Sequence, residues 1–401
     1  MTVSPARING EQRLILLGLG ALLASSIAAT FAGIFLGSQR HVLELIPGLM
    51  VLVPPLINMR GSIAGVLASR LSSSMHVGTF EVDFRRNSVL GDNIRASIII
   101  TVLIAFVLGI AAYLGSIFSG IPVIDLSDIV LISVVAGILS GLIITLITLG
   151  ISLSCYRFNL DLDMIAAPTV TTSGDLVTLP VLLFTALLIT SATPTTRMVL
   201  FVAALLLTAA SLVHSFSGQR QVRKIVHEWL PLLVLLSVLT TIAGLIYAID
   251  LATLIAWAAF LILIPPFMGG CGSIGGILCS RLSTSMHMGT LNPSIVPERE
   301  VVPFFLTTYL YGAVIIPLLA LIAHLAAVVL GLTTPGLPLL MAVSLGAGFV
   351  VLSLVNVIAY FSATLSFRYG LDPDNFGIPV ITSTIDLLGA VVIIAVINIV
   401  V

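Results

Sequence analysis

Two aspartates, Asp175 and Asp386, are the residues of this sequence best placed to do chemistry, because each interrupts a long apolar segment. Thr171 and Thr382 stand four residues earlier, which puts each on the same helix face as its aspartate. A carboxylate at membrane depth costs at least about 2.5–3.5 kcal/mol. Two facing carboxylates repel, and a divalent cation between them removes the repulsion. Hard oxygen donors of this kind suit Mg²⁺ or Ca²⁺.

Further oxygen donors flank the two aspartates. The residues that we expect to line a pathway are Thr171, Thr382, Thr172, Ser383, Pro168, Pro379, Ser62 and Ser273. The two prolines are expected to free backbone carbonyls and to bend their helices. Ahead of the same segments stand Asp161, Asp163, Asp372 and Asp374. These four can cap the helices, concentrate cations at an inner vestibule, or do both. The alternative for Asp175 and Asp386 is a local buried polar network.

The two aspartates belong to an internal repeat with a constant offset of 211 positions. The stretch PPLINMRGSIAGVLASRLSSSMHVGT (54–79) aligns without a gap with PPFMGGCGSIGGILCSRLSTSMHMGT (265–290), and 16 positions are identical. Shared apolar composition cannot align proline, arginine and histidine positions at one offset. The sequence therefore predicts a duplication, with a first repeat at 1–191, a linking segment at 192–224 and a second repeat at 225–401.

The elements that must position the aspartates are membrane-spanning helices. Apolar residues make up 59% of the 401 residues and charged residues 8%, whereas soluble domains carry about 25% charged residues. Each repeat contains five apolar segments long enough to cross a bilayer as helices. We predict an all-α integral membrane protein. It should be multi-pass and lie in the cell membrane, with no nucleic acid among its partners.

The linking segment predicts an eleventh helix. The run 198–213 is apolar and lies between basic residues. A crossing here makes the two five-helix repeats parallel, related by an axis along the membrane normal. With the N-terminus inside and the C-terminus outside, the inside loops hold eleven basic residues and the outside loops only Arg40 and Arg197, as the positive-inside rule favours. The alternative is a helix that lies in the interface.

The glycines of the second helices permit close packing. Gly61-Ser62 and Gly272-Ser273 lie at equivalent places. Packing is the simpler interpretation, and the alternative is that exposed carbonyls with Ser62 and Ser273 line the pathway.

These motifs resemble the MgtE-type magnesium transporters and, more closely, the duplicated MgtE-like solute carriers. The likeness rests on the two GSI-containing second-helix stretches and on the segments PTVTTSGD (168–175) and PVITSTID (379–386), which match the family pattern P-x-x-T-T-x-x-D. The resemblance implies Asp175 and Asp386 as central Mg²⁺ ligands and a pseudo-dimer within one chain.

Two departures from the family are visible. The family commonly has Gly-Asn in the second helix, where this chain has Gly61-Ser62 and Gly272-Ser273. No segment resembles the cytoplasmic sensor domains of the bacterial members, so we expect no gating through them.

The sequence thus predicts transport of a divalent cation, Mg²⁺ as substrate, through a pore at the interface of the two repeats. One alternative is a proton- or Na⁺-coupled transporter of another solute, with Asp175 and Asp386 as an ion relay. A second is a membrane scaffold without transport. No nucleophile and base stand together, so we do not expect an enzyme.

Overall fold

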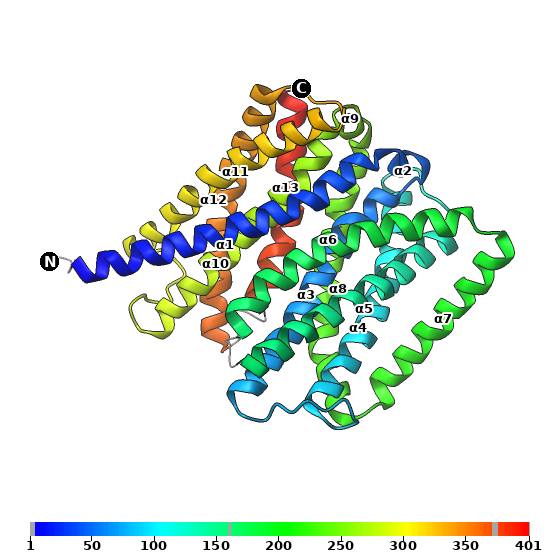
Figure 1. Ribbon diagram of the computed structural model, residues 1–401, viewed down its shortest axis with the longest axis horizontal. Coiled ribbons are helices and arrows are strands. Elements are labelled where there is room, and N and C mark those ends of the chain that lie inside the picture. Colours follow the sequence, from blue (N-terminus) through cyan, green and yellow to red (C-terminus); the bar gives the residue numbers. More distant parts are fainter. Residues whose placement is uncertain (1–4, 159–161, 371–375, 401) are drawn as a thin grey trace. The chain divides into compact units, whose positions relative to one another are not determined.

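The computed structural model describes residues 5–158, 162–370 and 376–400, without the side chains of 5–14, 162–168 and 170–172. The described chain consists of helices joined by connections, and the described residues form no β-strand (Figure 1). Its elements are α1 (Pro5–Ser38), α2 (Arg40–Leu45), α3 (Leu49–His76), α4 (Val89–Phe118), α5 (Leu126–Phe158), α6 (Leu162–Ser191), α7 (Pro194–Ser217), α8 (Arg220–Ile249), α9 (Leu251–Ala256), α10 (Ala258–His287), η1 (Arg299–Val301), α11 (Val302–Val329), α12 (Leu337–Tyr369) and α13 (Ile378–Val400).

Eleven helices of the described chain are long and apolar enough to cross a bilayer, which confirms the expected number. They are α1, α3 to α8 and α10 to α13, whereas α2, α9 and η1 are short connections. The linking helix α7 is 24 residues long, so it extends the apolar run 198–213 at both ends to the length that a bilayer needs.

Local sequence explains where these helices begin and how their polar side chains are satisfied. Thr193 caps α7 by accepting a hydrogen bond from the Thr196 amide, and Pro194 follows at the first helical position. Within the helices, hydroxyls such as those of Ser140 and Thr148 donate to carbonyls four residues earlier. Such bonds keep polar side chains satisfied where no water is present.

The chain divides into two compact units. Unit 1 contains residues 1–37 and 256–401, which hold α1 and α10 to α13, and unit 2 contains residues 38–255, which hold α2 to α8. In unit 2, α3 packs against α4, α5, α6 and α8. In unit 1, α10 packs against α11, α12 and α13. These units cut across the sequence repeats, whose boundaries remain a prediction.

The compact units differ from the sequence repeats in the place of the first helix of each repeat. A Cβ on Gly33 of α1 would collide with the carbonyl oxygen of Ile262 on α10, so α1 packs tightly on the second helix of the other repeat. A Cβ on Gly244 of α8 would collide in the same way with the carbonyl oxygen of Val51 on α3. Both contacts obey the offset of 211. The two repeats have therefore exchanged their first helices between the compact units.

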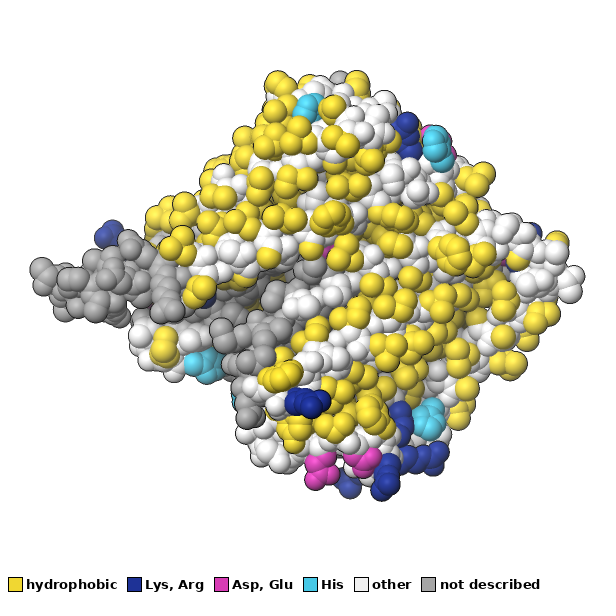
Figure 2. Space-filling view, viewed as in Figure 1, with side chains coloured by type: hydrophobic (Ala, Val, Ile, Leu, Met, Phe, Trp, Pro, Cys, Tyr) yellow, Lys and Arg dark blue, Asp and Glu magenta, His cyan; other side chains and the backbone are white. Residues whose placement is uncertain are grey.

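The outer faces of the helices carry the hydrophobic side chains expected to contact lipid. Figure 2 shows hydrophobic side chains over much of the drawn face. Leu206 on α7, Phe349 on α12 and Leu306 on α11 are all exposed. An apolar exterior suits a chain whose solvent is the bilayer.

Candidate functional site

The two aspartates lie well inside their helices. Asp175 is on α6 and Asp386 is on α13, and both are half-buried. Asp175 lies about 20 Å from the start of α6 and Asp386 about 12 Å from the start of α13, at 1.5 Å per residue. Both residues take part in polar or electrostatic interactions within the protein. The structure thus places one half-buried carboxylate on the last helix of each repeat.

The hydroxyl groups around Asp386 are well defined. Thr382 is half-buried, and its hydroxyl donates to the carbonyl oxygen of Pro379, 3.1 Å away. Its lone pairs stay available to a cation or its water shell. Ser383 is fully buried. Pro379 is the second residue of α13, in the first turn, where proline fits the helix. The bend expected at Pro379 stays a prediction.

The second helices pack closely against the helices that carry the aspartates. In unit 2 a Cβ on Gly174 of α6 would lie 3.8 Å from the amide nitrogen of Gly61 on α3. In unit 1 a Cβ on Gly272 of α10 would lie 3.3 Å from the Thr382 side chain. Close packing at the second-helix glycines is thus present in unit 1, where a Cβ on Gly275 would also lie 2.7 Å from the Ile381 side chain, whereas a Cβ on Gly61 or Gly65 of α3 meets nothing within 4 Å.

The neighbouring serines differ in their surroundings. Ser62 is buried, and its hydroxyl lies 3.4 Å from the amide oxygen of Asn58, one turn earlier in α3. Ser273, its repeat equivalent, is half-buried on α10. Whether either lines a pathway stays a prediction.

Some of the predicted residues lie outside the described part of the chain. These are Asp161, Asp372 and Asp374, and the side chains of Asp163, Pro168, Thr171 and Thr172. Among the residues that were described, no group of three or more histidine, cysteine, aspartate or glutamate side chains is arranged to hold a metal ion.

A buried arginine was not singled out from the sequence. Arg60 on α3 is only 2% exposed, and its Nη1 donates to the Thr101 hydroxyl on α4 at 3.3 Å. A Cβ on Gly141 of α5 would collide with this Nη1. The signal in the sequence was the mismatch between Arg60 and its repeat equivalent Cys271, inside the stretch where the repeats agree best.

The C-terminal parts of the second helices carry repeat-equivalent arginines with different partners. In unit 2 the Arg70 Nε donates to the Asn93 amide oxygen at 2.9 Å, and Nη1 lies 3.6 Å from a carboxylate oxygen of Glu228. In unit 1 the Arg281 guanidinium lies 5.5 Å from the ring centre of Phe304. Arg70 is thus held by polar partners on α4 and α8, and Arg281 lies over an aromatic ring on α11.

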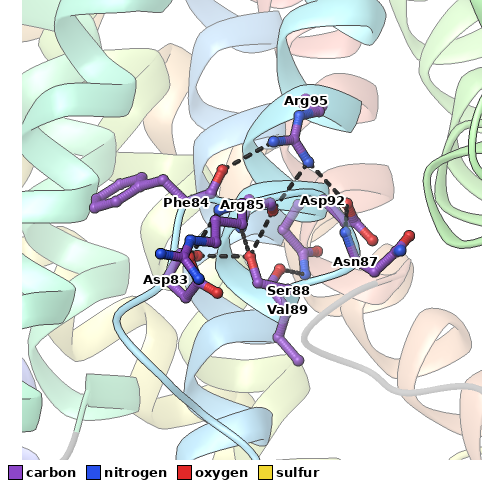
Figure 3. A network of polar contacts seen from close by, with 10 residues as sticks. Asp83, Phe84, Arg85, Asn87, Ser88, Val89, Asp92 and Arg95 are labelled. Atoms are coloured by element: carbon purple, nitrogen blue, oxygen red, sulfur yellow. Dashed lines mark hydrogen bonds and ion pairs between the residues drawn. The ribbon is translucent and has the colours of Figure 1, made fainter.

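Polar contacts also fix the connections that follow these helices. In unit 2 Arg95 pairs with Asp92 at 3.0 Å and donates to the carbonyl oxygens of Phe84 and Arg85 (Figure 3). In unit 1 Arg368 donates to the carbonyl oxygen of Pro293 at 2.8 Å. In each unit an arginine thus donates to backbone carbonyls of this connection. Arg95 lies on α4 and Arg368 on α12.

An ion pair joins the linking helix α7 to α5 within unit 2. The Arg197 Nη1 at the start of α7 lies 2.5 Å from the Asp128 Oδ2 on α5, and Asp128 is buried. The repeat equivalent of Asp128 is Leu339, which makes no such pair. This contact gives α7 a fixed attachment at one end.

Taken together, the fold and the site define a multi-pass helical membrane protein built from a duplicated unit, with one aspartate within the last helix of each copy. The family model of MgtE, described as a divalent cation transporter, matches residues 53–185 and again residues 264–396. The two matches are offset by 211 positions and cover more than half of the chain. The chain belongs to the MgtE family of divalent cation transporters, and this membership supports divalent cation transport.

Curated relatives align with this chain over most of its length. Solute carrier family 41 member 3 of Mus musculus is 25% identical over 392 residues, covering 92% of this chain and 78% of that protein. Solute carrier family 41 member 2 of Homo sapiens is 24% identical over 393 residues, covering 92% of this chain and 67% of that protein. No solved structure matches this chain.

Proposed function

We propose that this chain transports Mg²⁺ across the cell membrane and that the ion passes between the two repeats. Asp175 and Asp386 are the central ligands. One observation carries the proposal: the family of divalent cation transporters matches the chain twice, and each match ends in a helix with a half-buried aspartate. The proposed N-terminus is inside and the C-terminus outside.

The chemistry of the donors favours Mg²⁺ among the divalent cations. Mg²⁺ dehydrates reluctantly and keeps several of its waters when it binds to proteins. A pathway with two carboxylates and neighbouring hydroxyls, such as that of Thr382, suits a hydrated ion better than a bare one. Ca²⁺ takes six to eight oxygen ligands and needs more of them from the protein. Softer metals prefer sulfur or imidazole ligands.

The duplication supports a pathway between the repeats. In this proposal the two repeats are related by an axis along the membrane normal, which brings equivalent residues to that axis. One chain would then supply both carboxylates, so that a pseudo-dimer transports as a monomer. Asp161, Asp163, Asp372 and Asp374 form an inner vestibule in this proposal, and they raise the local cation concentration.

The test is a Mg²⁺ uptake assay on purified protein in liposomes that contain a Mg²⁺ indicator. We expect influx with the natural chain and none with the double variant Asp175→Asn, Asp386→Asn, because the amides keep the shape and lose the charge. Asp125→Asn is the matched control, since Asp125 is exposed in the connection before α5. Its influx should equal that of the natural chain.

Unchanged influx in the double variant would refute the proposed ligands. The coupled-transporter alternative predicts no Mg²⁺ influx with the natural chain and ion flux driven by a proton or Na⁺ gradient. A scaffold predicts no flux under any gradient.

A further inference from the structure

Arg60 is a positive charge buried within a membrane-spanning helix. It is the twelfth residue of α3, about 16 Å along the helix axis, and therefore lies deep in a bilayer of about 30 Å. Only 2% of its surface is exposed. Arginine keeps its charge in proteins. An ionised side chain at such a depth is costly and marks a functional role more often than a packing role.

The protein compensates this charge only weakly. The Nη1 donates to the Thr101 hydroxyl at 3.3 Å, and Nη2 lies 3.5 Å from the sulfur of Met59. The Nε has no hydrogen-bond partner, and no carboxylate in the described chain lies within ion-pair distance of Arg60. Two long contacts to neutral atoms do not neutralise a guanidinium. Its field therefore extends into the surroundings.

Helix α5 provides the space that the guanidinium fills. A Cβ on Gly141 would collide with Nη1, and a Cβ on Gly137 would lie 3.5 Å from Nη2. Thr101 on α4 completes the contacts. The first repeat is thus shaped around the buried arginine by small residues on a neighbouring helix.

The second repeat fills the equivalent space with uncharged, mostly apolar side chains. Cys271, Gly312 and Leu352 stand where Arg60, Thr101 and Gly141 stand in the first repeat. Cys271 and Leu352 are buried, and a Cβ on Gly312 would collide with the Leu352 side chain. The residues at these three positions differ together between the repeats, and in each repeat the second and third of these residues lie against each other. The buried charge is therefore specific to unit 2.

The charged residue adjoins the helix of the aspartate. A Cβ on Gly174 of α6 would lie 3.9 Å from the Arg60 Cβ, and Asp175 is the next residue. Coulomb interaction decays slowly where water is scarce, so a unit charge in this place acts on a cation held by Asp175. The interaction is repulsive for the cation and twice as strong for a divalent ion as for a monovalent one.

This repulsion lowers the affinity of a carboxylate site for its ion. A transport site must bind its ion strongly enough to admit it and weakly enough to release it. Two carboxylates with no opposing charge would fully compensate a divalent ion in a poorly hydrated interior and hold it. A nearby fixed positive charge weakens cation binding and speeds release.

We propose that Arg60 sets the affinity and release rate of the divalent cation at Asp175, as a positioned charge that does not touch the ion. This inference rests on the proposed function. The role belongs to the first repeat alone, because the second repeat has Cys271 at the same place.

The experiment measures Mg²⁺ binding to the purified chain by calorimetry, together with kcat and KM for uptake into liposomes. Arg60→Cys gives the first repeat the residue of the second. We expect the dissociation constant and KM to fall at least tenfold and kcat to fall with them, because release becomes slower. Arg60→Lys, which keeps the charge, should retain the affinity of the natural chain.

A second variant separates charge from packing. Arg60→Cys with Thr101→Gly and Gly141→Leu reproduces the hydrocarbon packing of the second repeat, and it should fold even where the single variant leaves a cavity. It should bind Mg²⁺ as tightly as Arg60→Cys. Unaltered affinity in this triple variant overturns the proposal, as does an equal gain in Arg60→Lys. Failure of the natural chain to bind or transport Mg²⁺ would instead overturn the proposed function.

Discussion

The interiors of unit 2 and unit 1 fill equivalent space with opposite chemistry. Unit 2 buries a guanidinium between α3, α4 and α5, and unit 1 buries the side chains of Cys271 and Leu352 in the corresponding place. The helices that carry Asp175 and Asp386 nevertheless pack on their second helices in both units. Duplication has thus preserved the scaffold around the aspartates, while the charge beside them has diverged. Symmetry of fold does not imply symmetry of electrostatics.

The largest effect on stability should come from the contacts that both units share. Gly33→Ala and Gly244→Ala each place a methyl group against a backbone carbonyl, which cannot move aside like a side chain. We expect each to lower the free energy of unfolding by about 3 kcal/mol or more, at the upper end of the usual cost of overpacking. Thermal unfolding in detergent measures this. Equal losses would support the exchange of first helices between the units.

The matched controls are Gly20→Ala on α1 and Gly150→Ala on α5, because a Cβ at either position meets nothing within 4 Å. Each should be neutral or slightly stabilising, since alanine favours helix more than glycine does. If Gly33→Ala unfolds at the temperature of Gly20→Ala, α1 does not pack on α10 as described.

A smaller effect should separate the two units. Gly141→Leu pushes a side chain into the space of the Arg60 guanidinium, and we expect a loss of about 1–3 kcal/mol. Adding Arg60→Cys and Thr101→Gly should recover most of the loss, because that set already packs in unit 1. A thermal-unfolding cycle measures this coupling. Additive losses would show that the two interiors are not interchangeable packings.

The smallest effect concerns the linking helix. Asp128→Asn removes the charge that pairs with Arg197 and should destabilise the attachment of α7 by about 1–2 kcal/mol. Faster proteolysis in the connection at 192–193 is the readout. The control is Leu339→Asn in unit 1, which alters the equivalent position without breaking an ion pair. Equal cleavage of both variants at 192–193 would show that Asp128 does not hold the start of α7.

Much of this architecture could be predicted from the sequence. The constant offset predicted the duplication, and the lengths of the apolar segments predicted eleven crossings. The family pattern around Asp175 and Asp386 predicted the candidate ligands, although their role stays a prediction. These features are local, because segment length and residue spacing along one helix are written directly in the sequence.

Two features could not be predicted in the same way. The exchange of α1 and α8 depends on which helices pack together, and an apolar helix in lipid has no polar face to indicate its neighbour. Gly33 and Gly244 showed only that a close approach was possible. The burial of Arg60 could not be predicted either, because it follows from neighbouring helices such as α5.

The most direct test of the account compares the two aspartates one at a time. Mg²⁺ influx into liposomes is measured for Asp175→Asn and for Asp386→Asn, with Asp175→Glu and Asp386→Glu as variants that keep the charge. The account predicts that each asparagine variant loses most of its influx and that each glutamate variant retains more than its asparagine counterpart. Influx equal to that of the natural chain in either asparagine variant would contradict the claim that both carboxylates hold the transported ion.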